Sequence, residues 1–183
     1  GDLGKAFIER YRNAIEPSQC HLMLAAKRRQ GLIVKAGNPC NIGGVDDLMR
    51  GDIRFVNRQA NSGTRILLDL LLQKRGIDSK AIRGFDNIEF THSAVSAMVA
   101  GDSVDVSIGN ESAAVAFNLD FIPLASESYF YAVLSANREH PGVIALRQIL
   151  ASPAWKDEVS KLDGLNVDGA GRVLKATELF GEN

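Results

Sequence analysis

The stretch Arg54–Gly76, RFVNRQANSGTRILLDLLLQKRG, constrains the fold of this chain more than any other. It predicts a short strand at 54–56, a polar turn at 57–62 and then a helix that begins at Gly63. The helix is expected because the apolar residues at 66, 67, 70 and 71 fall on one helical face. Basic residues precede Gly76, and both features are typical of a helix end. We therefore expect a strand–turn–helix unit at the centre of the chain.

The start of this helix has the residue types of an anion site. Ser62, Gly63 and Thr64 supply a capping hydroxyl, an unhindered backbone and a second hydroxyl where helical N–H groups lack partners. Free N–H groups and the positive end of the helix dipole attract anions, and Arg58 and Arg65 add positive charge. The same residues also suit an ordinary serine cap beside two surface arginines, so the motif alone leaves both interpretations open.

A second stretch of similar order follows. Thr91–Gly101 predicts a helix capped by its threonine, 104–108 predicts a strand, and 109–112 predicts a turn into a helix that ends near Phe117. The segment 20–36 suits either a hairpin or one long strand with a polar interruption. The remaining expectations are helices at 3–15, 45–49, 142–150 and 153–162, two strands at 119–124 and 129–134 separated by Ser126, Glu127 and Ser128, and a loop at 163–171.

Strands that alternate with helices predict an α/β fold with a mostly parallel sheet. In such sheets ligands bind where strands end and the following helices begin. We therefore expect the segments 57–65, 90–93 and 109–112 to lie at one edge of the sheet.

Charge and hydropathy exclude several kinds of partner. The net charge is −1 and the longest Lys/Arg run is the three residues 27–29, which argues against nucleic-acid binding by this segment. No apolar run approaches the ~18–20 residues of a membrane span, so no membrane partner is expected. The first residues lack the apolar core of a signal peptide, and the two cysteines are isolated, so we expect a cytoplasmic location.

Catalytic motifs are missing from the sequence. It contains no G-x-S-x-G, no G-x-x-x-x-G-K-[ST] and no G-x-G-x-x-G. The histidines at 21, 92 and 140 lack metal-ligand spacing, so we expect no metal, no catalytic residue and no cofactor. Glu111 is a candidate general acid or base, but a carboxylate at a helix start is also what the helix dipole stabilises. Hydroxyls and N–H groups at helix starts, without a nucleophile–base pair, indicate a non-catalytic binding domain.

Three segments, RFVNRQANSGTRILLDLLL, EFTHSAVSAMVAGDSVDVSIGNESAA and LDFIPLASESY, resemble the periplasmic-binding-protein-like domain of prokaryotic molybdate-related regulators. The similarity covers residues 31–162 and extends, more distantly, to type II periplasmic solute-binding proteins and to the effector domains of LysR-type regulators. It implies an α/β, type II periplasmic-binding-protein-like fold of two lobes that close on a small ligand. Residues 37–128 would form the second, ligand-binding lobe. Residues 1–36 and 129–183 would form parts of lobe one, incomplete in this chain, and the C-terminal helices.

The resemblance also implies which residues contact the ligand. The SGTR block would hold its anionic part, the TH pair would line a second loop, and the GNE block would lie near a third. Glycine usually precedes the SGTR block in the family, but this chain has Asn61, a residue type that tolerates the left-handed conformation. With the two residues that open the NRQ block, the expected ligand-binding residues are Asn57, Arg58, Ser62, Gly63, Thr64, Arg65, Thr91, His92, Gly109, Asn110 and Glu111.

The function that follows is binding of an oxyanion, such as molybdate, tungstate or sulfate, or of a carboxylate-bearing molecule. We expect the sensory part of a transcriptional regulator, which contacts DNA only through a separate helix-turn-helix domain; a homodimer is an open alternative. The other functions considered are an extracytoplasmic solute-binding protein of an ABC importer and a domain associated with molybdopterin biosynthesis.

Overall fold

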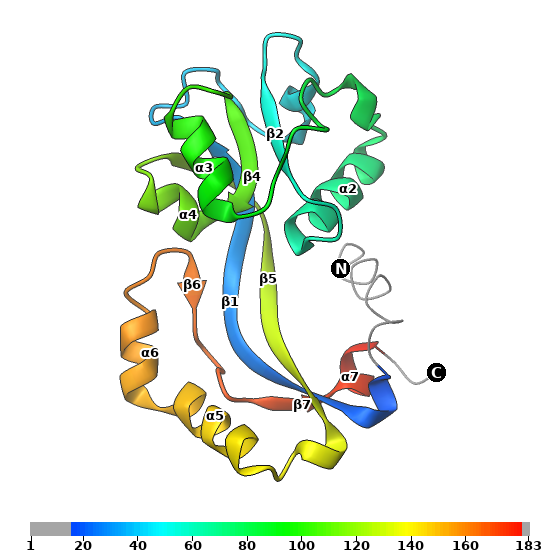
Figure 1. The fold of residues 1–183 in the computed structure, drawn as a ribbon, viewed down its shortest axis with the longest axis vertical. Coiled ribbons are helices and arrows are strands. Elements are labelled where there is room, and N and C mark those ends of the chain that lie inside the picture. Colours follow the sequence, from blue (N-terminus) through cyan, green and yellow to red (C-terminus); the bar gives the residue numbers. More distant parts are fainter. Residues whose placement is uncertain (1–15, 181–183) are drawn as a thin grey trace. The chain divides into compact units, whose positions relative to one another are not determined.

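The computed structural model describes residues 16–180 of the 183-residue chain, so the helix expected at 3–15 lies outside the described residues (Figure 1). The described strands are β1 (Cys20–Val34), β2 (Phe55–Arg58), β3 (Ile88–Glu89), β4 (Val106–Asn110), β5 (Asp120–Leu134), β6 (Leu165–Asn166) and β7 (Val173–Lys175). The described helices are α2 (Gly63–Arg75), α3 (His92–Ala100), α4 (Glu111–Ala116), α5 (Pro141–Ala151), α6 (Pro153–Val159) and α7 (Ala176–Phe180). Short 3-10 helices are η2 (Pro17–Gln19), η3 (Val45–Met49), η4 (Ser79–Ala81) and η5 (Ser135–Asn137).

The chain divides into two compact units. The central unit comprises Arg29–Ser126, and the terminal unit comprises Gly1–Arg28 with Glu127–Asn183. Both division points fall inside a strand, one in β1 and one in β5. The boundaries expected from the sequence, after residues 36 and 128, fall in the loop that follows β1 and within β5.

The sheet of the central unit has the strand order β3-β2-β4-β1-β5. β2 is parallel to both of its neighbours, β3 and β4. β1 is antiparallel to β4, in a register that pairs Gln30 with Asn110 and Val34 with Val106. The expected α/β fold is confirmed, with a mixed sheet in which β3, β2 and β4 form the parallel part.

Successive residues of these strands belong to two hydrophobic cores, one on each face of the sheet. On β2, Phe55 packs in the core that contains Leu68 of α2, whereas Val56 packs with Val95 of α3. Ala114 of α4 belongs to the second core as well. Because side chains alternate across a strand, this division places α2 on one face and α3 and α4 on the other, as Figure 1 shows.

The terminal unit is built on the first half of β1. β6 and β7 pair antiparallel with it, through Lys27–Arg28 and His21–Met23 respectively. Met23 and Leu150 of α5 are buried in one cluster, and Trp155 of α6 packs against it. Trp155 therefore has the packing role of a core aromatic residue.

The sequence prediction of two separate strands at 119–124 and 129–134 is wrong, because β5 runs unbroken through Ser126, Glu127 and Ser128. Polar residues are tolerated within a strand where they need not be buried, and no residue of β5 is fully buried. Glu127 also forms an ion pair with Arg28 of β1 within the terminal unit. For residues 20–36, the single long strand is the alternative that the structure adopts. The loop expected at 163–171 contains the short strand β6.

Candidate ligand-binding site

Three helices of the central unit begin at the same edge of its sheet. α2, α3 and α4 follow β2, β3 and β4, and these strands are parallel, so their carboxyl ends share one edge. Ser62, Thr91 and Asn110 cap the three helices. Their side chains accept hydrogen bonds from backbone N–H groups three residues later, at 3.2, 3.0 and 3.0 Å. The sequence therefore located the starts of α2 and α3 correctly, whereas α4 begins inside the turn predicted at 109–112. The fold gathers all three helix starts at one edge.

The turn into α2 has the conformation that its residue types allow. Asn61 has a φ of 67°, the left-handed region expected for this position. Gly63 and Thr64 follow the cap, and helix geometry provides no earlier carbonyl for their N–H groups. The Thr64 hydroxyl is buried and donates to the side-chain oxygen of Gln30 at 3.1 Å. The Thr64 hydroxyl therefore serves the protein, and the backbone N–H is the group of Thr64 that lacks a partner within the helix.

Arg65, in the first turn of α2, is fixed by two contacts. Its Nε donates to Asp69 Oδ1 at 2.9 Å, and its guanidinium carbon lies 4.2 Å from the centre of the Phe85 ring. Its side chain is only 16% exposed. Among the described residues, neither terminal nitrogen of Arg65 has a hydrogen-bond or ion-pair partner. The guanidinium is therefore held in place by one edge and one face, with its terminal donors available.

Asn57 and Arg58 belong to the end of β2, and the sequence prediction that placed them in a turn is wrong. Asn57 is buried and donates from Nδ2 to the carbonyl oxygen of Phe85 at 3.1 Å. Arg58 is also buried, and its Nη2 donates to the carbonyl oxygen of Phe90 at 3.0 Å. These bonds stabilise the polar residues inside the strand, and they attach the segments before and after β3 to β2.

His92 and Asn110 are joined across the edge. The backbone N–H of Asn110 donates to His92 Nδ1 at 3.3 Å, which assigns the ring proton of a neutral His92 to Nε2. A β carbon at Gly109 would stand 3.3 Å from His92 Nδ1 and 2.7 Å from Ile33 Cδ1. Gly109 therefore permits this approach by its lack of a side chain. Gly109 and Asn110 end β4 and α4 begins at Glu111, so the sequence prediction of a turn at 109–112 is wrong.

Glu111 opens α4 and pairs with Arg29 of β1. Arg29 Nε donates to Glu111 Oε2 at 2.5 Å, and its Nη2 contacts the other carboxylate oxygen. The Glu111 side chain is 13% exposed and lies in the first turn of α4, where the helix dipole attracts negative charge. Because both carboxylate oxygens contact Arg29, the pair is suited to holding α4 against β1.

Sequence reasoning missed Arg29, Gln30 and Phe90. Arg29 and Gln30 stood in a polar interruption, but the antiparallel register of β1 and β4 places Gln30 opposite Asn110, at the candidate edge. Gln30 is fully buried. Its position between two apolar segments was the sequence feature that could have indicated a buried polar residue. Phe90 directly precedes the Thr91 cap and is 71% exposed, an unusual exposure for an aromatic side chain.

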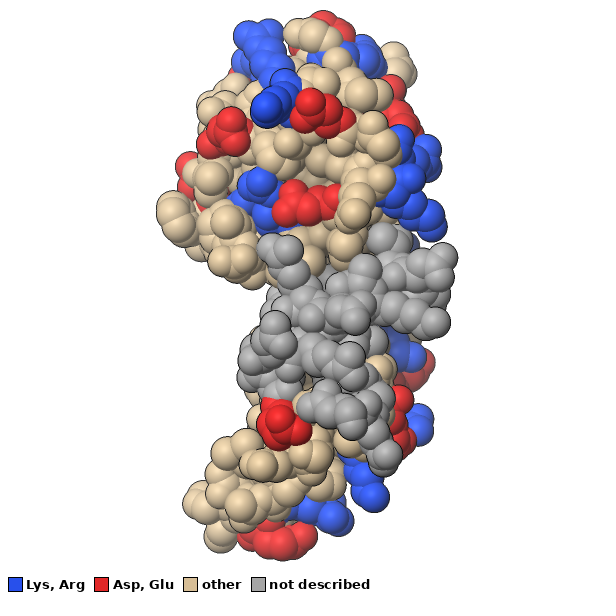
Figure 2. All heavy atoms as spheres, turned by 90° about the vertical axis from the view of Figure 1, so that its right-hand side faces the viewer, with Lys and Arg blue, Asp and Glu red and all other residues tan. Residues whose placement is uncertain are grey.

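Positive and negative side chains are mixed on the face of the molecule that Figure 2 shows. On the face shown in Figure 2, Lys and Arg side chains are interspersed with Asp and Glu, without a broad patch of one sign. Within residues 16–180, no three His, Cys, Asp or Glu side chains come together in a way that would hold a metal ion. None of the described helices has the length and apolarity to cross a membrane.

The mixed sheet, with three helix starts at the carboxyl edge of its parallel strands, defines an α/β domain whose candidate ligand site lies at that edge. The chain belongs to the PBP superfamily domain family, whose sequence model matches residues 2–151. This confirms the periplasmic-binding-protein-like part of the resemblance. It does not distinguish regulators from transport proteins within the superfamily.

The chain is also similar to individual proteins, one by sequence and two by fold. The uncharacterized protein YvgK of Bacillus subtilis is 38% identical over 150 residues, which are 82% of this chain and 48% of YvgK. The chain thus spans about half the length of that relative. A substrate-binding protein assigned to a phosphate ABC transporter of Clostridium perfringens, solved with bound phosphate, has a TM-score of 0.57 at 15% identity; the match covers 91% of this chain and 94% of that protein. The substrate-binding domain assigned to a molybdenum ABC transporter of Clostridium difficile has a TM-score of 0.55 at 15% identity, with 88% and 82% covered.

Proposed function

We propose that the central unit binds a small anionic ligand without transforming it, at the edge where α2, α3 and α4 begin. The observation that carries this proposal is Arg65, whose guanidinium is immobilised by Asp69 and Phe85 while its terminal nitrogens lack protein partners among the described residues. An arginine fixed in this way loses little conformational entropy on binding and presents two parallel donors. Carboxylates and tetrahedral oxyanions accept from such a fork in bidentate fashion.

The neighbouring groups add to this arginine. The N–H groups of Gly63 and Thr64 lie at the positive end of the 13-residue helix α2, which favours negative charge. The next two helices begin along the same edge: α3 starts at His92 after its cap Thr91, and α4 starts after its cap Asn110. Glu111 is already neutralised by Arg29, so it does not leave an uncompensated negative charge at the edge. The set offers hydrogen-bond donors and positive charge but no nucleophile–base pair, which supports binding without catalysis.

Phe90 favours a carboxylate-bearing organic ligand over a bare oxyanion. Phe90 is 71% exposed and directly precedes the cap residue Thr91. Its ring can pack against the apolar part of a ligand, which buries apolar surface on both. Molybdate, tungstate and sulfate have no apolar part to occupy it. Arg65 and the α2 N–H groups suit both kinds of ligand, so inorganic anions are included in the binding experiment below.

We further propose that the chain is the sensory part of a cytoplasmic transcriptional regulator that contacts DNA through a separate domain. The second candidate, an extracytoplasmic solute-binding protein of an ABC importer, is favoured by the assignments of the two solved structures to ABC transporters. Fractionation of cells of the source organism, followed by immunodetection of this chain, separates the two: recovery outside the cytoplasmic membrane supports the importer.

The first experiment is a thermal-shift panel with molybdate, tungstate, sulfate, phosphate and small aliphatic and aromatic carboxylates. A ligand at ~100 times its dissociation constant adds about 2.7 kcal/mol to stability, which raises the melting temperature visibly for a chain of this size. A stabilising anion whose effect is lost in Arg65→Ala supports the proposal. A shift that persists in Arg65→Ala, or no shift with any anion, contradicts it.

A further inference from the structure

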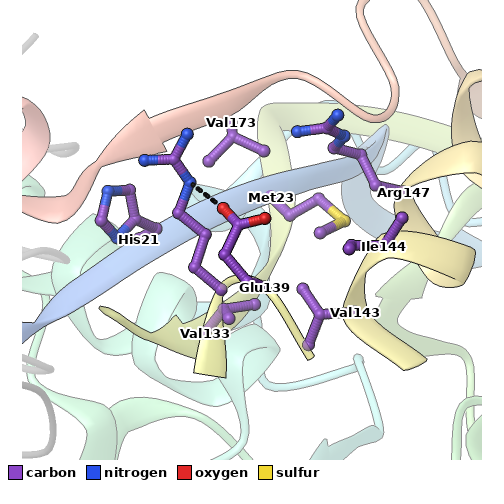
Figure 3. Close-up of a pocket in the computed structure, with 9 residues that line it drawn as sticks. His21, Met23, Val133, Glu139, Val143, Ile144, Arg147 and Val173 are labelled. Atoms are coloured by element: carbon purple, nitrogen blue, oxygen red, sulfur yellow. Dashed lines mark ion pairs between the residues drawn. The ribbon is translucent and has the colours of Figure 1, made fainter. Parts of the chain in front are cut away.

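The terminal unit contains a hollow of about 90 Å³, well separated in sequence from the candidate edge (Figure 3). Five segments line it: β1, β5, the turn after η5, the first two turns of α5, and β7. All of these lie in the terminal unit, so the hollow is a feature of that unit alone. Nothing in the proposed function uses these residues.

The floor of the hollow is apolar and its rim is charged. Met23, the floor residue on β1, is 2% exposed. The apolar lining residues are Met23, Val133, Val143, Ile144 and Val173, and the polar ones are His21, Arg138, Glu139 and Arg147. Figure 3 shows His21 and Arg147 on opposite sides of the hollow, with Met23 and Val173 between them. A cleft with an apolar floor and a few polar groups is the usual form of a small-molecule site.

Arg147 supplies an available positive charge at this rim. Among residues 16–180 its side chain makes no ion pair or hydrogen bond. The other rim arginine, Arg138, faces Glu139 across 3.6 Å, a long contact between two exposed side chains. His21 Nδ1 lies 3.1 Å from the Ser135 hydroxyl, so that ring has a neutral partner. The rim therefore carries more positive than negative charge, beside the positive end of α5.

We propose that this hollow binds a small monocarboxylate with a short, branched aliphatic tail, in addition to the anion bound by the central unit. The carboxylate pairs with Arg147, and the tail rests on Met23, Val143 and Val173. An inorganic anion would leave the apolar floor uncovered, and a neutral hydrocarbon would leave Arg147 unpaired. A branched monocarboxylate satisfies both parts of the hollow.

The test is a titration of the full chain with isovalerate, followed by amide chemical shifts in two-dimensional NMR. The expected result is saturable shifts at residues of β1, β7 and the first turns of α5. Arg147→Gln should raise the dissociation constant about tenfold, because it removes the one charged partner of the carboxylate. Arg172→Gln is the matched control: it also removes an exposed arginine from the terminal unit, but Arg172 does not line the hollow, so affinity should not change.

Two comparisons keep the proposal separate from the site in the central unit. Isopentanol, the neutral analogue, should shift the same amides at least tenfold more weakly, and phosphate should shift them little. Isovalerate shifts that fall only in the central unit, that are absent, or that are unchanged in Arg147→Gln would overturn the proposal. Equal shifts with phosphate would overturn the role of the apolar floor.

Discussion

Arg65→Ala should weaken anion binding far more than it weakens the fold. The wild-type guanidinium presents two terminal nitrogens that have no described protein partner, and each bond to an anion is charge-assisted. Removing such an interaction costs about 1.5–3 kcal/mol, which corresponds to a dissociation constant raised roughly ten- to 150-fold.

The cost to folding is smaller and can be worked from the two contacts that fix this side chain. The ion pair with Asp69 has i,i+4 spacing on a helix and contributes about 0.3–0.5 kcal/mol. The stacking on Phe85 at 4.2 Å contributes about 0.5–1 kcal/mol. Urea unfolding of the variant should therefore show a loss of about 1 kcal/mol, leaving a folded protein whose affinity can be measured.

Arg75→Ala is the matched control on the same helix. Arg75 also pairs with a carboxylate, that of Asp46 at 2.7 Å, but it lies in the last turn of α2, away from the candidate edge. Calorimetric titration with the anion that gives the largest thermal shift should show unchanged affinity for Arg75→Ala and a large loss for Arg65→Ala. Equal affinities of the two variants would refute the assignment of Arg65.

Three further predictions concern the fold and the ligand. Gly31→Ala should destabilise the chain by about 3 kcal/mol or more in thermal melts, because its β carbon would stand 2.1 Å from a carbonyl oxygen of β5, whereas Gly51→Ala, with open space, should not. Hydrogen bonds from Arg54 hold the pKa of Asp105 below its ordinary 3.8, so this carboxylate stabilises the fold above about pH 4 and that contribution is lost as pH falls through the lowered pKa. Asp105→Asn should accordingly be less stable than wild type in urea at pH 7, with a gap that narrows below pH 4; a constant gap would contradict this. Phe90→Ala should weaken an aromatic carboxylate severalfold in calorimetry but leave sulfate or phosphate binding unchanged; an equal loss for both would refute its contact with the apolar part.

The sequence determined the local structure around the candidate edge. Apolar spacing located α2 and α3, and the capping preferences of Ser62 and Thr91 located their first residues to within one position. The tolerance of asparagine for left-handed angles predicted the conformation of Asn61. These features depend on neighbours a few residues away along the chain, which is why the sequence alone contains them.

Tertiary structure decided which side chains are available. No local pattern shows that Arg65 stacks on Phe85, that the Thr64 hydroxyl is bonded to Gln30, or that Arg29 neutralises Glu111. The same holds for β5, which continues through Glu127 because Arg28 of β1 lies beside it. These partners are between 20 and 99 positions apart in the chain, the longest being the Arg28–Glu127 pair at 99. Hydrogen bonds, stacking and charge act over a few ångströms of space, so which of these partners meet is decided by the order and direction of the strands and not by their order in the sequence.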